Sequence, residues 1–258
     1  MSSKGVAFVT GAARGIGRAI ALQLAEDGFD VAVNDLAKAS AQLDTVVEEI
    51  KQKGRASSSH TGDVSQNEDV KNMIAAVVQI HGGLDVMVAN AGTALDRPFG
   101  TSILELTPED WDRIMGVNAR GTFLCYQHAA VQMIKQGRGG RLIGACSVLG
   151  KQMVMPNVGA YGASKFAIRA LTQAAALEFG KHGITVNAYA PGAVDTELLT
   201  GTDSATANGI RDHFKGRSPL NAIGTPQDIA HVVSFLVAKE SHFITGQAIS
   251  VNGGLYFD

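Results

Sequence analysis

The chain of 258 residues has few cysteines, few prolines and almost no net charge. Its two cysteines, Cys125 and Cys146, show no Cys-x-x-Cys or metal-ligand spacing, so we expect reduced thiols rather than disulfides. The seven histidines are scattered, with no His-x-x-x-His pair, which argues against a protein-bound catalytic metal. A chain of this length can bury a hydrophobic core that is stable without disulfides or a structural metal.

The net charge of −2 provides no basic field for nucleic acid and no polybasic segment for a membrane surface. No uninterrupted apolar run is long enough to cross a bilayer, and the first residues, MSSKG, lead into a strand-like segment rather than a secretory leader. The last residues, GLYFD, carry no peroxisomal or endoplasmic-reticulum signal. We therefore expect a cytoplasmic protein without nucleic-acid or membrane partners.

Apolar residues (45%) and glycines (30) are abundant, and their order along the chain predicts the fold. Short apolar runs alternate with longer segments of helical spacing, which is typical of a parallel sheet covered on both faces. We expect an α/β fold in which residues 1–258 form one domain, a single doubly wound parallel sheet of the Rossmann type with helices on both faces. The expected strands are residues 6–9, 31–33, a weak strand before Asp63, 84–89, 141–145, 184–188 and 248–251. The expected helices are residues 16–27, 43–51, one through Val70, Ile74 and Val77, 107–135, 161–181, and one that starts at Thr225.

Residues 195–218 break this pattern, because they are polar, small and punctuated by glycine, with helical hints only at 198–199 and 210–214. A long irregular segment inside a compact domain is often a substrate lid or a binding loop. The alternative is a tolerated surface insertion.

The most informative pair of residues is Tyr161 and Lys165, which lie four positions apart on a predicted helix. Residues at this spacing share one helix face, so the ammonium group lies beside the phenol. A neighbouring cation favours the phenolate and lowers the tyrosine pKa from about 10. The pair thus predicts a tuned proton donor and acceptor, with an ordinary solvated helix face as the alternative.

A glycine-rich segment, TGAARGIG at residues 10–17, follows the first predicted strand and opens the first helix. Glycines let the backbone turn sharply, and the free N–H groups of a helix N-terminus can bind a pyrophosphate. The position after an amino-terminal strand predicts a dinucleotide site, with a plain tight turn as the alternative. Three residues separate the first two glycines, so the spacing is not Gly-x-Gly-x-x-Gly.

The glycine spacing together with Tyr-x-x-x-Lys resembles the short-chain dehydrogenase/reductase family, and the resemblance covers essentially the whole chain. Further motifs match in order. They are the family's Asn-Asn-Ala-Gly, with Ala89 in place of the first Asn, the helix asparagine Asn118, the serine Ser147, and Pro-Gly-x-x-x-Thr from Pro191 to Thr196. Local sequences at 145–147, 164–169 and 171–173 look most like the acetoin/diacetyl reductase and butanediol dehydrogenase branch.

The resemblance implies an NAD(P)-dependent short-chain alcohol dehydrogenase or carbonyl reductase, which transfers a hydride reversibly between nicotinamide and an alcohol or carbonyl carbon. The implied catalytic residues are Asn118, Ser147, Tyr161 and Lys165. Tyr161 would exchange a proton with the substrate oxygen, Ser147 would hydrogen-bond that oxygen, and Lys165 would tune Tyr161 and bind the ribose. Asn118 would hold a water that links Lys165 to solvent, although a satisfied kink within a helix is the alternative for this residue.

The implied cofactor residues lie in six segments of the chain. They are Gly11, Arg14, Gly15, Ile16, Gly17, Asp35, Asp63, Val64, Asn90, Ala91, Gly92, Tyr161, Lys165, Pro191, Gly192, Val194 and Thr196. Asp35 ends the second predicted strand, where a carboxylate accepts hydrogen bonds from the ribose hydroxyls and repels a 2′-phosphate. Arg14 could instead pair with that phosphate, but Leu36 stands where a second cation is common in NADP-preferring relatives. We therefore expect NAD(H), with NADP(H) possible.

The substrate is expected to be a secondary alcohol or ketone with an apolar substituent. Val148 stands where the acetoin and butanediol branch often has a glutamine, which places a small diol in doubt. The expected substrate-binding residues are Ser147, Val148, Leu149, Met153, Tyr161, Ala193 and Leu198, with Met155 nearby, although the methionines and leucines could equally be core residues.

Other functions share these motifs. A 3-oxoacyl dehydrogenase or a sugar or polyol dehydrogenase of the same family has the same residues, whereas an NAD-binding scaffold or sensor would lack part of the catalytic set. The family also implies a homotetramer, with the helices that start near Thr107 and Tyr161 at one interface.

Overall fold

The computed structural model describes residues 2–94, 101–200 and 204–257. Its centre is a 7-stranded sheet in the order β3-β2-β1-β4-β5-β6-β7, and all neighbouring strands are parallel. The strands are β1 (Val6–Thr10), β2 (Asp30–Asp35), β3 (Ser57–Thr61), β4 (Val86–Ala89), β5 (Gly140–Ala145), β6 (Ile184–Pro191) and β7 (Ala248–Val251). The predicted doubly wound parallel sheet is confirmed, and the weak strand before Asp63 is β3.

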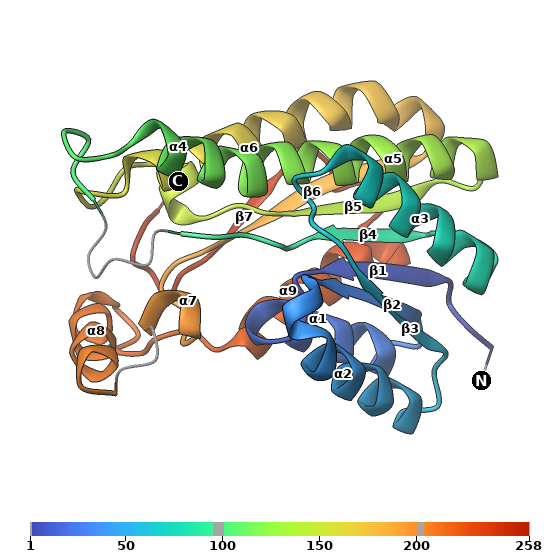
Figure 1. The fold of residues 1–258 in the computed structure, drawn as a ribbon, viewed down its shortest axis with the longest axis horizontal. Coiled ribbons are helices and arrows are strands. Elements are labelled where there is room, and N and C mark those ends of the chain that lie inside the picture. The colour runs from blue at the N-terminus through green and yellow to red at the C-terminus, as the bar shows by residue number, and fades with distance from the viewer. Residues whose placement is uncertain (1, 95–100, 201–203, 258) are drawn as a thin grey trace.

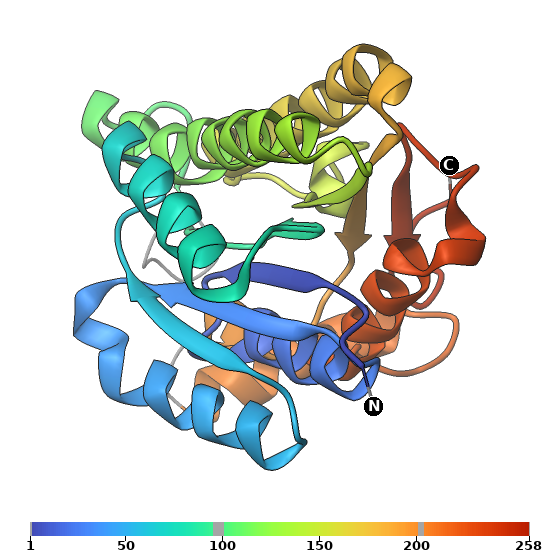
Figure 2. The same cartoon turned by 90° about the vertical axis from the view of Figure 1, so that its right-hand side faces the viewer.

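Helices cover both faces of the sheet, as the two views in Figures 1 and 2 show. The helices are α1 (Gly15–Glu26), α2 (Ser40–Gln52), α3 (Asn67–His81), α4 (Pro108–Ile114), α5 (Gly121–Gln136), α6 (Gly159–Phe179), α7 (Glu197–Thr200), α8 (Ser204–Arg217) and α9 (Pro226–Val237). Apolar residues of α1, α2 and α9 form one buried cluster against the sheet, and those of α3, α5 and α6 form a second cluster on the opposite face. The strands are therefore buried from both sides, which explains their continuous apolar runs.

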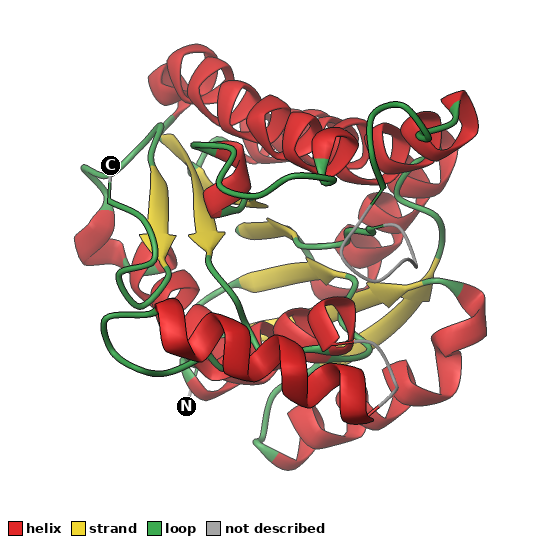
Figure 3. Cartoon of the chain, turned by 90° about the vertical axis from the view of Figure 1, so that its left-hand side faces the viewer, coloured by secondary structure: helices red, strands yellow, loops and turns green. Residues whose placement is uncertain are grey.

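The carboxyl ends of the strands form one edge of the sheet, where loops gather in the view of Figure 3. The strand order reverses between β1 and its neighbour β4, and ligands of open α/β sheets bind at such a switch point. We call this end the carboxyl edge and the opposite end the amino edge. Helices α7 and α8 lie beside the carboxyl edge (Figure 1).

The helix predicted over residues 107–135 contains an interruption of its α-helical pattern. Thr107 caps α4 by accepting the N–H of Asp110 at 3.1 Å, as the Thr-Pro start signal predicts. Between α4 and α5, Met115–Arg120 form a π-helical segment. Such segments insert one wider turn into an α-helix and often occur at functional sites.

The prediction of an irregular segment at 195–218 is wrong for most of its length. Helices α7 and α8 occupy much of it, while residues 201–203 lie outside the described residues. The helices depend on contacts that composition does not reveal: Ala207 is buried, and the Arg211 guanidinium donates to Asp195 Oδ1 at 2.8 Å. A polar helix fixed by such contacts has too weak an apolar face to be recognised from sequence.

Candidate active site

The glycine-rich segment turns from β1 into α1 with a geometry that only glycine tolerates. Gly11 and Gly15 have φ angles of +62° and +56°, in the left-handed region. A Cβ on Gly17 would lie 2.1 Å from the carbonyl oxygen of Gly11, and one on Gly11 would lie 2.8 Å from Cα of Ala91. The loop is therefore held close to the end of β4.

Asn90 attaches the glycine-rich loop to β4. Its Nδ2 donates to the carbonyl oxygens of Thr10 at 2.8 Å and Gly11 at 3.0 Å, while its Oδ1 accepts from the Tyr189 hydroxyl at 2.7 Å. The Thr10 hydroxyl accepts the N–H groups of Asn90 and Ala91. Asn90 and Ala91 thus fix the start of the glycine-rich loop against the end of β4.

The N-terminus of α1 fits a dinucleotide pyrophosphate. Its N-cap residue, Arg14, makes no side-chain cap, and its first turn carries no acidic residue. The first N–H groups of a helix have no partner within the helix and attract an anion. An uncapped N-terminus after two left-handed glycines is the arrangement that a pyrophosphate needs, so Gly15, Ile16 and Gly17 would hold the phosphates.

Asp35 lies at the end of β2, next to the glycine-rich loop. Its Oδ2 accepts the N–H of Ala13 at 3.1 Å and its Oδ1 accepts that of Leu36 at 2.9 Å. Arg14, the possible partner of a 2′-phosphate, instead forms an ion pair with Glu197 of α7. A carboxylate therefore lies at the end of β2 beside the loop, and the Arg14 charge is paired.

The remaining predicted cofactor residues line the same edge. Asp63 Oδ1 accepts the N–H of Ser65 at 2.8 Å, and Val64 is buried where a Cβ on Gly121 of α5 would lie 2.9 Å from its Cγ2. Both residues therefore form a turn at the end of β3.

The segment after β6 approaches the glycine-rich loop from the other side. Pro191 ends β6, Gly192 donates its N–H to Val251 at 3.0 Å, and Val194 is buried. The methyl carbon of Thr196 lies 3.6 Å from the position of a Cβ on Gly15. The structure thus brings the first and last predicted cofactor segments together.

Ser147, Tyr161 and Lys165 form one cluster at the end of β5. Ser147 follows β5 and makes a side-chain hydrogen bond with Tyr161 of α6. Lys165 lies one turn further along α6, with Nζ 5.3 Å from the centre of the Tyr161 ring and 2.7 Å from the carbonyl oxygen of Ala145. The spacing of Tyr161 and Lys165 therefore does place the two side chains together, and the solvated-face alternative is wrong because Lys165 is buried.

The expected lowering of the Tyr161 pKa is not what the structure shows. Burial raises the pKa of Tyr161 to about 12, and the hydrogen bond with Ser147 offsets only part of this rise. Burial also lowers the pKa of Lys165 to about 8. The physical reason is that loss of water opposes both charges, while the ammonium group bonds the Ala145 carbonyl rather than the phenol oxygen.

Asn118 lies in the π-helical segment and faces this cluster. Its side chain is fully buried, exchanging hydrogen bonds with the backbone of Thr93 at 2.8 and 3.0 Å and donating to the Ser164 hydroxyl at 3.0 Å. A Cβ on Gly92 would lie 3.3 Å from Asn118 Oδ1 and 3.6 Å from Lys165 Nζ. The polar atoms of the Asn118 side chain thus all have hydrogen-bond partners within the protein. The residue lies in the π-helical turn and is also a neighbour of the cluster of Ser147, Tyr161 and Lys165.

Sequence reasoning missed Thr93 and Ser164 as the residues that hold Asn118. Ser164 directly precedes Lys165, so a Ser-Lys pair after the tyrosine is a sequence feature that could have indicated it. Thr93 bonds through its backbone, which leaves no trace in side-chain chemistry.

The predicted substrate residues divide into buried and exposed groups. Val148 and Leu149 are buried beside Ser147, whose hydroxyl accepts the N–H of Leu149 at 3.2 Å. Met153 and Leu198 are 44% and 57% exposed, which fits surfaces that a substrate would cover better than it fits core residues. Met153 lies over α6, where a Cβ on Gly162 would meet its sulfur at 2.3 Å. Ala193 is half-buried in the segment between Pro191 and Thr196.

Neither a metal cluster nor a membrane span occurs in the described part of the chain. Over residues 2–94, 101–200 and 204–257, no three His, Cys, Asp or Glu side chains gather where they could hold a metal ion. No helix within those same ranges is both long and apolar enough to cross a bilayer. Cys125 and Cys146 are free and buried.

Known proteins resemble this chain over nearly its full length. The family model described as "Enoyl-(Acyl carrier protein) reductase" matches residues 11–256. A short-chain dehydrogenase/reductase of Armillaria gallica is 52% identical, covering 98% of this chain and 96% of that protein. The 3-oxoacyl-[acyl-carrier-protein] reductase FabG of Staphylococcus epidermidis is 41% identical, with 97% and 98% covered.

Solved structures include a neighbour from the branch that the local motifs indicated. The acetoin dehydrogenase YohF of Salmonella typhimurium has a TM-score of 0.84 at 34% identity, covering 98% of this chain and 97% of that chain. The resemblance drawn from the motifs is therefore confirmed. This chain belongs to the short-chain dehydrogenase/reductase family of oxidoreductases.

Proposed function

We propose that this protein catalyses reversible hydride transfer between NAD(H) and a secondary alcohol or ketone, with Tyr161 as the acid-base residue. The observation that carries the proposal is the cluster at the end of β5, where Ser147 bonds Tyr161 and buried Lys165 lies 5.3 Å from the Tyr161 ring. This cluster lies at the same edge of the sheet as the glycine-rich loop and the Thr196 segment.

Bound NAD(H) would supply or accept the hydride. In reduction, the Tyr161 hydroxyl gives its proton to the substrate oxygen, and in oxidation it takes that proton back. The Ser147 hydroxyl donates a hydrogen bond to the same oxygen as negative charge develops there. Lys165 would hold positive charge beside the phenol and bond the ribose, and Asn118 would order the solvent side of Lys165. Asp35 would accept hydrogen bonds from the adenosine ribose, which would favour NAD(H) over NADP(H).

The test of this proposal is Tyr161→Phe, which removes only the hydroxyl. Since general acid-base catalysis contributes roughly 10²–10⁴-fold, turnover should fall by that factor while NADH affinity, followed by fluorescence, stays within about twofold. Phe166→Leu on the exposed side of α6 is the matched control and should keep full turnover. Near-normal turnover of Tyr161→Phe would remove Tyr161 from the reaction, and an inactive wild type with normal NADH binding would favour a scaffold or sensor.

A second candidate substrate class is a 3-oxoacyl thioester, because the FabG relative is a 3-oxoacyl-[acyl-carrier-protein] reductase. A polyol or sugar is the third class with the same residues. Initial rates for apolar secondary ketones, acetoin, a polyol and a 3-oxoacyl thioester, each with NADH and NADPH, separate these classes. The exposed Met153 and Leu198 favour the apolar ketone, and a polyol preferred by more than tenfold would contradict that choice.

We also propose a homotetramer. Trp111 of α4 and Phe123 of α5 are 41% and 42% exposed, which fits side chains at a helix interface between subunits. Light scattering after size exclusion gives the subunit number directly. A monomer at micromolar concentration would contradict the proposal.

A further inference from the structure

A cavity lies at the amino edge of the sheet, away from the candidate active site. It has a volume of about 420 Å³ and is bounded by the start of β5, the start of β6 and the loop before β7. Its lining residues are Arg138, Arg141, Gly180, Gly183, Ile184, Thr185, His242 and Thr245. Strand β5 has 6 residues, so about 20 Å of sheet separates this cavity from the carboxyl edge.

Arg141 brings an unpaired positive charge to this cavity. It is paired in register with Thr185 on the neighbouring strand, so the two side chains leave the sheet side by side on one face. Its Nη1 donates to the Gly140 carbonyl at 3.1 Å, but its buried Nε has no hydrogen-bond partner, and no described carboxylate lies within ion-pair distance. Burial, without an opposing charge, lowers the pKa of Arg141.

Thr185 adds a second unsatisfied group to the wall of the cavity. Its residue is 7% exposed, and its buried hydroxyl has no partner among the residues that the structure describes. A buried polar group without a hydrogen bond destabilises the folded state, so two such groups on adjacent strands indicate a missing partner.

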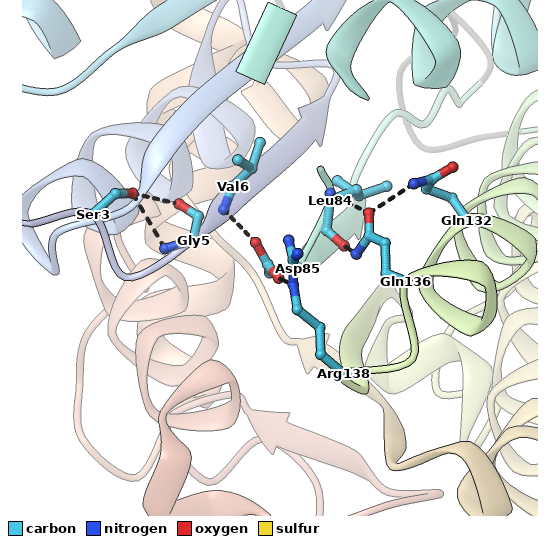
Figure 4. A network of polar contacts seen from close by, with 8 residues as sticks. All are labelled: Ser3, Gly5, Val6, Leu84, Asp85, Gln132, Gln136 and Arg138. Carbon is cyan, nitrogen blue, oxygen red and sulfur yellow. Dashed lines mark hydrogen bonds and ion pairs between the residues drawn. The ribbon is translucent and has the colours of Figure 1, made fainter. Parts of the chain in front are cut away.

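Asp85, the acidic residue that pairs with Arg138 of the cavity wall, uses both carboxylate oxygens in the network of Figure 4. Asp85 Oδ1 accepts from Arg138 Nε at 2.7 Å, and its Oδ2 accepts the N–H of Val6 at 2.8 Å. Gln136 in the same network bonds both the N–H and the carbonyl of Leu84. Asp85 thus neutralises the charge of Arg138 and accepts the first N–H of β1. Both of its oxygens are used, so it is not a counterion for Arg141.

The donors around the cavity suit a phosphate group. The unpaired Arg141 guanidinium, the Thr185 hydroxyl and the His242 ring approach from three separate segments of chain, with the Asp85-paired Arg138 beside them. A guanidinium group binds phosphate oxygens in a bidentate manner. A volume of about 420 Å³ lies in the range of roughly 300–1,000 Å³ that small-molecule sites occupy. We propose that this cavity is a binding site for a small phosphorylated metabolite, with inorganic phosphate as its minimal ligand.

The experiment is calorimetric titration of the full-length protein with inorganic phosphate at constant ionic strength, with chloride and acetate as comparison anions. Wild type should bind one phosphate per chain and melt at a higher temperature in its presence. Arg141→Gln and the nearly isosteric Thr185→Val should each weaken phosphate binding at least tenfold. Circular dichroism of both variants verifies that they are folded.

A matched control excludes the glycine-rich loop as the source of the signal. The titration is repeated with saturating NADH, which would occupy the N–H groups of the glycine-rich loop at the start of α1, and phosphate binding should then be unchanged. Loss of phosphate binding in the presence of NADH, together with its retention in Arg141→Gln, would overturn the proposal, as would equal effects of phosphate, acetate and chloride on the wild type. Tighter binding of glycerol 3-phosphate than of phosphate assigns the cavity to a metabolite, and equal binding assigns it to the free ion; both results support a phosphate site.

Discussion

At the carboxyl edge of the sheet, Arg14 pairs with Glu197, and the two side chains are 74% and 57% exposed. At the amino edge, Arg138 pairs with Asp85, whose side chain is only 21% exposed and whose second oxygen accepts the N–H of Val6. Exposed pairs contribute at most about 1 kcal/mol to stability, whereas a carboxylate that also satisfies a buried N–H contributes more. The same residue types therefore stabilise the fold at one edge and stay accessible to a ligand at the other.

Buried groups show the same division between the two edges. At the carboxyl edge, burial moves the pKa of Tyr161 up to about 12 and that of Lys165 down to about 8, so both charged forms are disfavoured in the folded protein. At the amino edge, Asp85 accepts the N–H of Val6 in β1, and Gln136 accepts the N–H of Leu84, two residues before β4. We infer that substitutions at the first edge change turnover and those at the second change stability.

After Tyr161→Phe, the largest expected effect is that of Ser147→Ala, which removes a donor beside the Tyr161 hydroxyl. Turnover should fall by about 10²–10³-fold, as for the loss of one donor to a developing oxyanion. The melting temperature should fall only slightly, because the one other described bond of this hydroxyl is to the N–H of Leu149. Steady-state kinetics with a thermal melt measures both. An unchanged turnover with a large loss of stability would reverse the proposed division.

An intermediate effect is expected for Asp85→Ala at the amino edge. The free energy of unfolding should fall by about 2 kcal/mol, because the Val6 N–H loses its acceptor and Arg138 loses its partner. Urea denaturation measures this change, and turnover should stay within about twofold of wild type.

The matched control for Asp85→Ala is Glu197→Ala, which breaks the exposed pair with Arg14. Its unfolding free energy should change by less than about 1 kcal/mol. Equal destabilisation by the two substitutions would show that the two edges do not differ in this way.

The smallest effect is expected for Asp35→Ser, which keeps a hydrogen-bonding side chain but removes the negative charge. The ratio of kcat/KM for NADH to that for NADPH should fall about tenfold, equivalent to about 1.4 kcal/mol. Stability should change little, since serine can still accept the N–H of Ala13 or Leu36. If the cofactor ratio is unchanged, Asp35 acts only on the loop backbone.

The sheet could be predicted because its strands are buried on both faces and read as continuous apolar runs. Helix α9 could be predicted because its start signal, Thr225-Pro226, is local: Thr225 accepts the N–H of Asp228, and Asp228 accepts that of Thr225. Helix α8 could be predicted only at residues 210–214, because its full extent depends on Ala207 and on the bond of Arg211 to Asp195, which are tertiary contacts.

The residues of the candidate site could be predicted from the sequence, but the directions of their pKa shifts could not. The spacing of Tyr161 and Lys165 fixes their shared helix face, and this neighbourhood is confirmed by a distance of 5.3 Å. The direction of the Tyr161 pKa depends on how much water the fold removes, which no spacing encodes. The position of the unpaired Arg141 beside Thr185 could not be predicted either, because it depends on the register of β5 against β6.

The π-helical segment Met115–Arg120 has a consequence for insertions and deletions. A π turn holds one residue more than an α turn, so this helix contains one residue beyond what its length requires. Deleting a single residue there would let α4 and α5 rejoin as one regular helix without breaking the chain path. The faces of α4 and α5 would stay as they are, because the wide turn absorbs the extra residue, and only side chains within Met115–Arg120 would change direction. Chain length at this point, rather than side-chain identity alone, therefore determines whether Asn118 faces Thr93 and Ser164.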